Sequence, residues 1–181
     1  MRCGDRTTDS RRSLSAQTSA SSGKPSPNTV RTKSRTPVDA SLVVRRVAEV
    51  GHGLYAAKSY LARYPVRSAA DLKGRPLLTG PAADVETKWF AKLAKDTPPT
   101  FTSVLAVALA EAARTGAGIA VLPRFLGDAI AELEHLPMPD EPHETLWLTV
   151  HRDLRSTPRV RAVLDFLIGE FKRERLTLRG R

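Results

Sequence analysis

Cysteine and long apolar runs are nearly absent from the 181-residue sequence. The single cysteine, Cys3, has no partner for a disulfide within the chain. No apolar stretch approaches the roughly 20 residues of a membrane-spanning helix, and the first residues lack the apolar core of a secretion signal. We therefore expect a cytoplasmic protein that makes no membrane contact.

Histidine is scarce as well, with four residues: His52, His135, His143 and His151. No two of them have metal-ligand spacing on one expected helix, and one cysteine cannot build a zinc site. The sequence therefore predicts neither a metal site nor a cofactor.

The net charge of +10 suggests nucleic acid, so its distribution matters. Residues 1–40 carry eight Lys or Arg and three Asp, which places half of the excess in the first fifth of the chain. The remainder is only mildly basic, which favours an ordinary solvated surface over a polyanion site.

Residues 1–37 are rich in Ser, Thr, Arg and Pro, and their apolar residues are isolated. Such a segment cannot build a buried face, so we expect low-complexity disorder, with an out-of-frame origin as one interpretation. No helical periodicity is present, and no helix-turn-helix can be placed here.

From Pro37 onward the chain alternates strand-like and helix-like segments. Short strands are expected at 42–44, 54–56, 76–79, 119–122 and 146–150. Helices are expected at 58–63, after Asp84, from Thr102 or Ser103 to Gly116, at 125–133, and from a Thr157 cap to Phe171. This alternation predicts an α/β fold with a largely parallel sheet.

Two motifs suggest an enzyme at first, but neither has the sequence context that such a site requires. Gly116-Ala117-Gly118 follows a helix and precedes a strand, the reverse of a nucleotide-binding loop, so a tight turn explains it. Ser103 lacks a nucleophile-elbow context and an identifiable His or Asp partner. We expect no enzyme.

Thr102 and Ser103 stand at an expected helix start. Free N–H groups and the helix dipole make such a position receptive to a carboxylate or phosphate. A plain N-cap is the alternative, and one residue can serve both roles.

Four motifs then occur in a characteristic order. They are His52–Leu61, Ser68–Leu78, the helix–Gly-x-Gly–strand–Leu-Pro run Ala112–Pro123, and Leu146–Arg155 followed by Pro158–Ala162. Together they resemble the effector (substrate)-binding domain of LysR-type transcriptional regulators, over roughly residues 38–173.

The resemblance implies a fold like that of type 2 periplasmic binding proteins, with two α/β lobes around a small-molecule effector. Residues 38–175 would form a partial effector-binding domain, with a largely complete second lobe at about 52–150, most of the first lobe missing, and a basic tail at 176–181. The family's N-terminal winged helix-turn-helix has no counterpart in the sequence.

The resemblance implies that the chain senses a small effector and thereby controls transcription. A carboxylate or other anion is the favoured class of effector. The implied effector-binding residues are Thr79, Gly80, Pro81, Thr102 and Ser103. The intact parent would be a homo-oligomer and would contact DNA only through the missing winged helix-turn-helix. The alternatives are a non-functional remnant, a mis-started or frameshifted product, and a solute-binding protein of the same fold.

Overall fold

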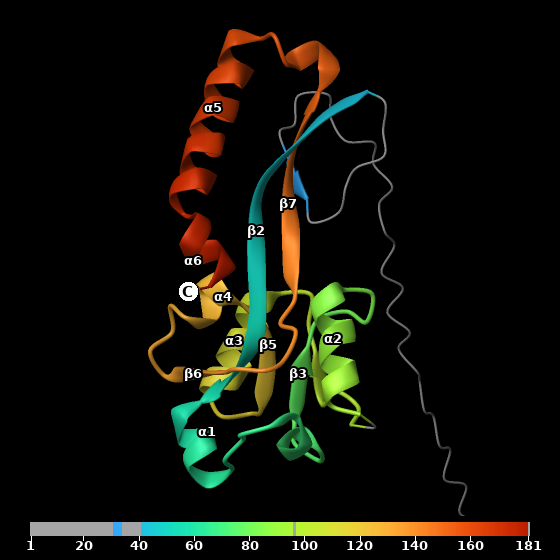
Figure 1. Ribbon diagram of the computed structural model, residues 1–181, viewed down its shortest axis with the longest axis vertical. Coiled ribbons are helices and arrows are strands. Elements are labelled where there is room, and N and C mark those ends of the chain that lie inside the picture. The colour runs from blue at the N-terminus through green and yellow to red at the C-terminus, as the bar shows by residue number, and fades with distance from the viewer. Residues whose placement is uncertain (1–30, 34–40, 96, 181) are drawn as a thin grey trace, which may run out of the picture.

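One mixed sheet of seven strands organises the chain (Figure 1). The computed structural model describes residues 31–33, 41–95 and 97–180. The strands are β1 (Arg31–Lys33), β2 (Leu42–Ala57), β3 (Leu77–Thr79), β4 (Phe101–Thr102), β5 (Ile119–Pro123), β6 (Leu133–Leu136) and β7 (His143–His151). Their order is β1-β7-β2-β5-β3-β4, and β6 also pairs with β2.

The helices cover this sheet. They are α1 (Lys58–Arg63), α2 (Val85–Leu93), α3 (Ala106–Arg114), α4 (Arg124–Gly127), α5 (Pro158–Arg173) and α6 (Arg175–Arg179), with short 3₁₀ turns at Ala69–Leu72 and Arg152–Leu154. The α/β class is confirmed. The expectation of a largely parallel sheet is wrong, because only the β3–β4 and β3–β5 pairs are parallel.

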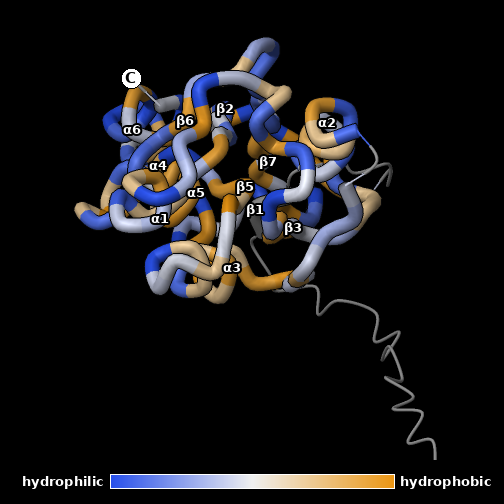
Figure 2. The backbone as a smooth tube through the Cα atoms, turned by 90° about the horizontal axis from the view of Figure 1, so that it is seen from below, coloured by the Kyte–Doolittle hydropathy of each residue, from blue (hydrophilic) through white to orange (hydrophobic). Residues whose placement is uncertain are grey.

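The half of the molecule built on β3, β4 and β5 has a core on both faces of the sheet. Successive strand residues face opposite sides. Leu77 accordingly packs with Phe90 on the side of α2, and Leu78 packs with Leu109 on the side of α3. Viewed along the long axis, Figure 2 shows hydrophobic segments around β5 at the centre. This three-layer arrangement fixes the ends of β3 and β4, where the candidate site lies.

Strand β2 runs without interruption through both halves of the molecule, whereas the sequence suggested two short strands, 42–44 and 54–56. Strand β7 pairs along Leu42–Gly51, and β5 and β6 pair along His52–Ala57, so the segment that contains Gly51 and Gly53 is part of the strand. The glycines permit close packing. A Cβ added at Gly51 would lie 2.1 Å from the carbonyl oxygen of Arg179, and one added at Gly53 would lie 2.7 Å from Nε2 of His135.

The other half of the molecule consists of the outer parts of β2 and β7 with α5 beside them (Figure 1). Helix α5 starts at Pro158 after Thr157, as predicted, but none of its residues is buried. A cavity of about 670 Å³ separates the helix from the strands. It is lined by apolar and charged side chains, among them Val43, Leu148, Leu164, Arg45 and Arg161. Packing here is therefore much looser than around β5.

Both ends of the described chain differ from expectation. Arg31–Lys33 form strand β1 on the edge of β7, so the prediction of disorder is wrong for these three residues. Strand pairing uses backbone groups and needs no apolar periodicity, which explains the miss. The rest of the 1–37 prediction lies outside the described residues. The expected basic tail at 176–181 is helical up to Arg179 and packs on β2 and α4.

Two local predictions are also wrong. Helix α3 begins at Ala106 rather than at Thr102 or Ser103, because parallel pairing with β3 extends through Thr102. The helix expected at 125–133 ends at Gly127, and Leu133–Leu136 form β6, because that segment pairs with the open edge of β2. The Gly116–Gly118 segment is the predicted helix-to-strand turn, with φ of +83° at Gly116.

Candidate functional site

The carboxyl ends of β3 and β4 bring together residues that are distant in the sequence. Thr79 is aligned with Thr102 in the parallel pair, and the N–H of Ser103 donates a hydrogen bond of 3.1 Å to the carbonyl oxygen of Thr79. Gly80 follows β3 directly. In open α/β sheets, ligands bind outside the carboxyl ends of the strands, so this edge has the expected position for a ligand.

A pocket of about 220 Å³ lies at this edge, between the strand ends and α2. Its lining is largely apolar, with Leu77, Ala82, Phe90, Ala91 and Pro99, and it includes Gly80 and four threonines, Thr79, Thr87, Thr97 and Thr102. Apolar walls with a few placed polar groups are typical of small-molecule sites.

The hydroxyl of Thr87 is the most informative polar group in the pocket. Thr87 is 8% exposed, and its Oγ1 atom is buried without a hydrogen-bond partner in the described part of the chain. A buried hydroxyl without a partner is unfavourable. Thr87 contributes this unpaired hydroxyl to the lining of the pocket.

The five residues suggested by sequence divide into two groups. Thr79, Gly80 and Thr102 line the pocket, whereas Pro81 and Ser103 do not. The Ser103 hydroxyl accepts a hydrogen bond of 3.1 Å from the N–H of Leu105, and so it shapes the turn before α3.

Thr87 was missed because the buried face of α2 was misassigned. The apolar residues of the helix expected after Asp84 are Val85, Trp89, Phe90 and Leu93, and their spacing predicts one buried side, yet Val85 is 49% exposed and the buried residues of α2 are Thr87 and Phe90. The three-residue spacing between these two residues was the available signal. Its polar side chain made Thr87 look like a surface residue.

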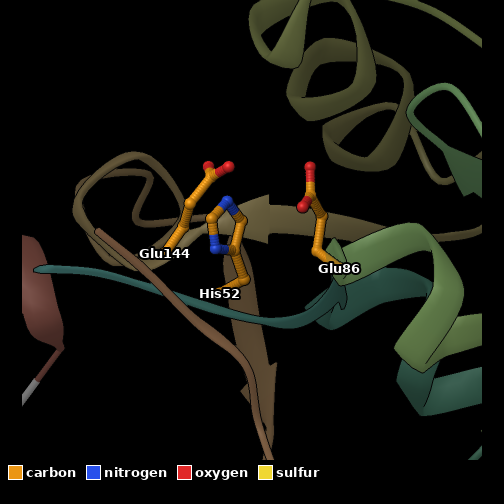
Figure 3. A group of neighbouring side chains, drawn as sticks. All are labelled: His52, Glu86 and Glu144. Atoms are coloured by element: carbon orange, nitrogen blue, oxygen red, sulfur yellow. The ribbon is translucent and has the colours of Figure 1, made fainter. Parts of the chain in front are cut away.

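A second polar group lies where β2 passes from one half of the molecule to the other. One potential ligand atom each from His52, Glu86 and Glu144 lies within 4.8 Å of the others. In Figure 3 the imidazole of His52 stands between the two carboxyl groups. Burial lowers the pKa of His52, against the opposing influence of Glu144, and burial raises the pKa of Glu86.

A network of hydrogen bonds and ion pairs occupies the opposite face of β2. Tyr55 donates a hydrogen bond of 2.5 Å to Asp128, and Arg124 lies 3.4 Å from both Asp128 and Glu141. Glu141 is also 2.7 Å from Nε2 of His135. The network joins β2, α4, β6 and the loop before β7, which holds this part of the molecule in a defined arrangement.

Comparison with known proteins decides the family. The family described as LysR substrate binding domain matches residues 31–172. The chain belongs to this family. No curated protein sequence matches it.

Solved structures of LysR-type regulators have the same fold. The regulatory domain of CrgA from Neisseria meningitidis is 23% identical with a TM-score of 0.65, and the match covers 78% of this chain and 74% of that one. The regulatory domain of a C227S variant of AphB from Vibrio vulnificus is 20% identical with a TM-score of 0.62, covering 82% and 79%. The chain matches 52% of the longer CrgA structure.

LysG from Corynebacterium glutamicum was solved at full length with bound effector Arg. It is 17% identical to this chain with a TM-score of 0.57, and the match covers 78% of this chain and 50% of LysG. None of the described helices has the length and apolar character needed to cross a bilayer.

Proposed function

We propose that this chain is the effector-sensing portion of a LysR-type transcriptional regulator and that its effector binds at the carboxyl ends of β3 and β4. One observation carries the proposal. Thr79, Gly80 and Thr102, which the sequence resemblance singled out, line one pocket together with the unpartnered hydroxyl of Thr87. The pocket is large enough only for a small molecule or for part of one.

The proposed effector class is a carboxylate or a similar anion. Helix α3 begins four residues after Thr102, and among the described residues the N–H groups of Ala106 and Val107 in its first turn have no backbone acceptor, although neither residue lines the pocket itself. Such groups and the helix dipole favour negative charge. The effector Arg bound to LysG is a small molecule that carries a carboxylate.

Ligand-induced thermal stabilisation tests the site. A panel of small carboxylates and matched neutral amides is added to the purified chain, because a ligand that binds only the folded state raises the Tm. We expect a carboxylate hit whose stabilising effect is lost in Thr87→Val and Thr102→Val. Thr100→Val is the matched control, since Thr100 is exposed outside the pocket. Equal loss in the control would contradict the site.

We also propose that this chain does not recognise operator DNA by itself, since no described element has the form of a winged helix-turn-helix. Binding through its basic charges would weaken steeply with salt. A gel shift that discriminates one promoter at about 0.2 M salt would contradict this.

A further inference from the structure

Three different elements contribute to the group formed by His52, Glu86 and Glu144. His52 lies in β2, Glu86 near the start of α2, and Glu144 near the start of β7. Their nearest nitrogen and oxygen atoms lie within 4.8 Å of one another (Figure 3). An imidazole and two carboxyl groups at this separation form a set of metal-ligand types.

Two atoms of this group are buried without hydrogen-bond partners among the described residues. His52 is 6% exposed and its Nδ1 atom has no partner, and the Oε2 atom of Glu86 has none either. Buried polar groups are normally paired, so the unpaired Oε2 of Glu86 beside His52 indicates a partner that is neither side chain nor backbone. In Figure 3 the nitrogen of His52 that faces the two carboxyl groups is Nε2, which leaves this nitrogen directed at the same position. The neighbouring groups do not satisfy these atoms.

Charge limits what this partner can be. Two carboxyl groups face one histidine here, and Asp84 adds a further electrostatic influence on both His52 and Glu86. An anion would be repelled at this point. A cation would offset the mutual repulsion of the carboxylates and accept an electron pair from the neutral imidazole.

We propose that His52, Glu86 and Glu144 bind a divalent first-row transition-metal ion of the Zn²⁺ type. Imidazole is a good ligand for such ions, whereas Ca²⁺ requires six to eight oxygen ligands. Three protein ligands leave a fourth tetrahedral position for water or another small donor.

Only a modest adjustment would complete the site. Zn–N and Zn–O bonds of about 2.0–2.2 Å place tetrahedral ligand atoms about 3.3–3.6 Å apart. Glu86 and Glu144 are half-buried, and rotation of their side chains toward His52 would close the remaining distance. The metal–ligand bonds would connect α2 to both β2 and β7. These are the two long strands that run between the halves of the molecule.

Metal titration of the full chain tests the proposal without effector or DNA, so its outcome is independent of the proposed function. The chain is stripped with a chelator and titrated with Zn²⁺ in competition with a chromophoric chelator, and with Co²⁺ by visible absorption. The background is Cys3→Ser, since a thiol is also a metal ligand. We expect one ion per chain and an affinity at least about tenfold lower in His52→Gln, Glu86→Gln and Glu144→Gln.

His151→Gln and Glu134→Gln are matched controls outside the group, and both should retain wild-type affinity. Zn²⁺ should also raise the Tm of the Cys3→Ser protein and of these controls, but not of the three ligand variants. Absence of stoichiometric binding in Cys3→Ser, or unchanged affinity in His52→Gln, would overturn the proposal.

If a ligand variant does not fold, the Co²⁺ spectrum of the Cys3→Ser protein is decisive. Visible ligand-field bands of a four-coordinate ion support the site, and the weak spectrum of hydrated Co²⁺ overturns it.

Discussion

Gly127 lies directly against the ring of Tyr55, so that a Cβ added at Gly127 would be 2.3 Å from the ring atom Cζ. The ring is 1% exposed and its hydroxyl is bound to Asp128, so it has little freedom to move away. This contact fixes α4 against the carboxyl-terminal part of β2.

Gly127→Ala should therefore destabilise the protein, by about 1–3 kcal/mol as is typical of overpacking. Chemical denaturation measures the change. Gly169→Ala is the matched control, because nothing lies within 4 Å of a Cβ at Gly169 in the interior of α5. That control should be stabilising by about 0.5–1 kcal/mol. Equal effects of the two substitutions would contradict the packing described.

Tyr55→Phe should cost about 1–2 kcal/mol at neutral pH, because Asp128 loses its phenol donor. The substitution should also change the alkaline behaviour. Burial, and after it the hydrogen bond to Asp128, raises the pKa of Tyr55, so the unfolded chain ionises first and the free energy of unfolding falls as pH rises above about 10. Denaturation between neutral pH and alkaline pH measures this fall. It should be smaller in Tyr55→Phe than in the exposed control Tyr64→Phe.

The pKa of Asp71 should lie below its ordinary value. Its Oδ2 atom accepts hydrogen bonds of 2.9 Å from the N–H of Arg67, 3.1 Å from the hydroxyl of Ser68 and 2.9 Å from the N–H of Ser68, and these bonds favour the carboxylate. The resulting stability is complete above about pH 4 and is lost as pH falls through the lowered pKa. In an NMR titration, Ser68→Ala should raise this pKa and Ser59→Ala should not. An unchanged value in Ser68→Ala would refute the assignment.

Helix α5 should exchange its amide hydrogens faster than helix α3 and strand β5. No α5 residue is buried, whereas Leu109, Ala110 and Ala113 of α3 are buried. Amides in loosely packed elements exchange through local opening. Hydrogen exchange on monomeric protein should show lower protection for 158–173 than for 106–122. Equal protection would mean that α5 is more firmly packed than the cavity beside it indicates.

The sequence predicted best those elements whose signals are local. Helix α5, with a Thr157 cap and Pro158 at its first position, carries such short-range markers, and its start was correctly placed. The positions of Thr79, Gly80 and Thr102 came from motif order, and the structure brings these three together.

Features that depend on distant partners were not predictable in this way. Strand β6 exists because β2 offers an unpaired edge, and β1 because β7 offers another. Thr87 and His52 can be recognised as unusual only once their burial is known. A threonine on a helix and a lone histidine in a strand carry no local sequence signal that their side chains lack a hydrogen-bond partner.

The uninterrupted course of β2 determines where the gene can be divided or extended. Gly51-His52-Gly53 would be chosen from the sequence as a linker for separating the two halves. A cut there severs a strand whose residues pair with β7 on one side and with β5 on the other. Gly74 and Gly116 are better insertion points, because they lie at turns with nothing within 4 Å of an added Cβ. Reporter or affinity sequences inserted at these turns should leave the fold intact.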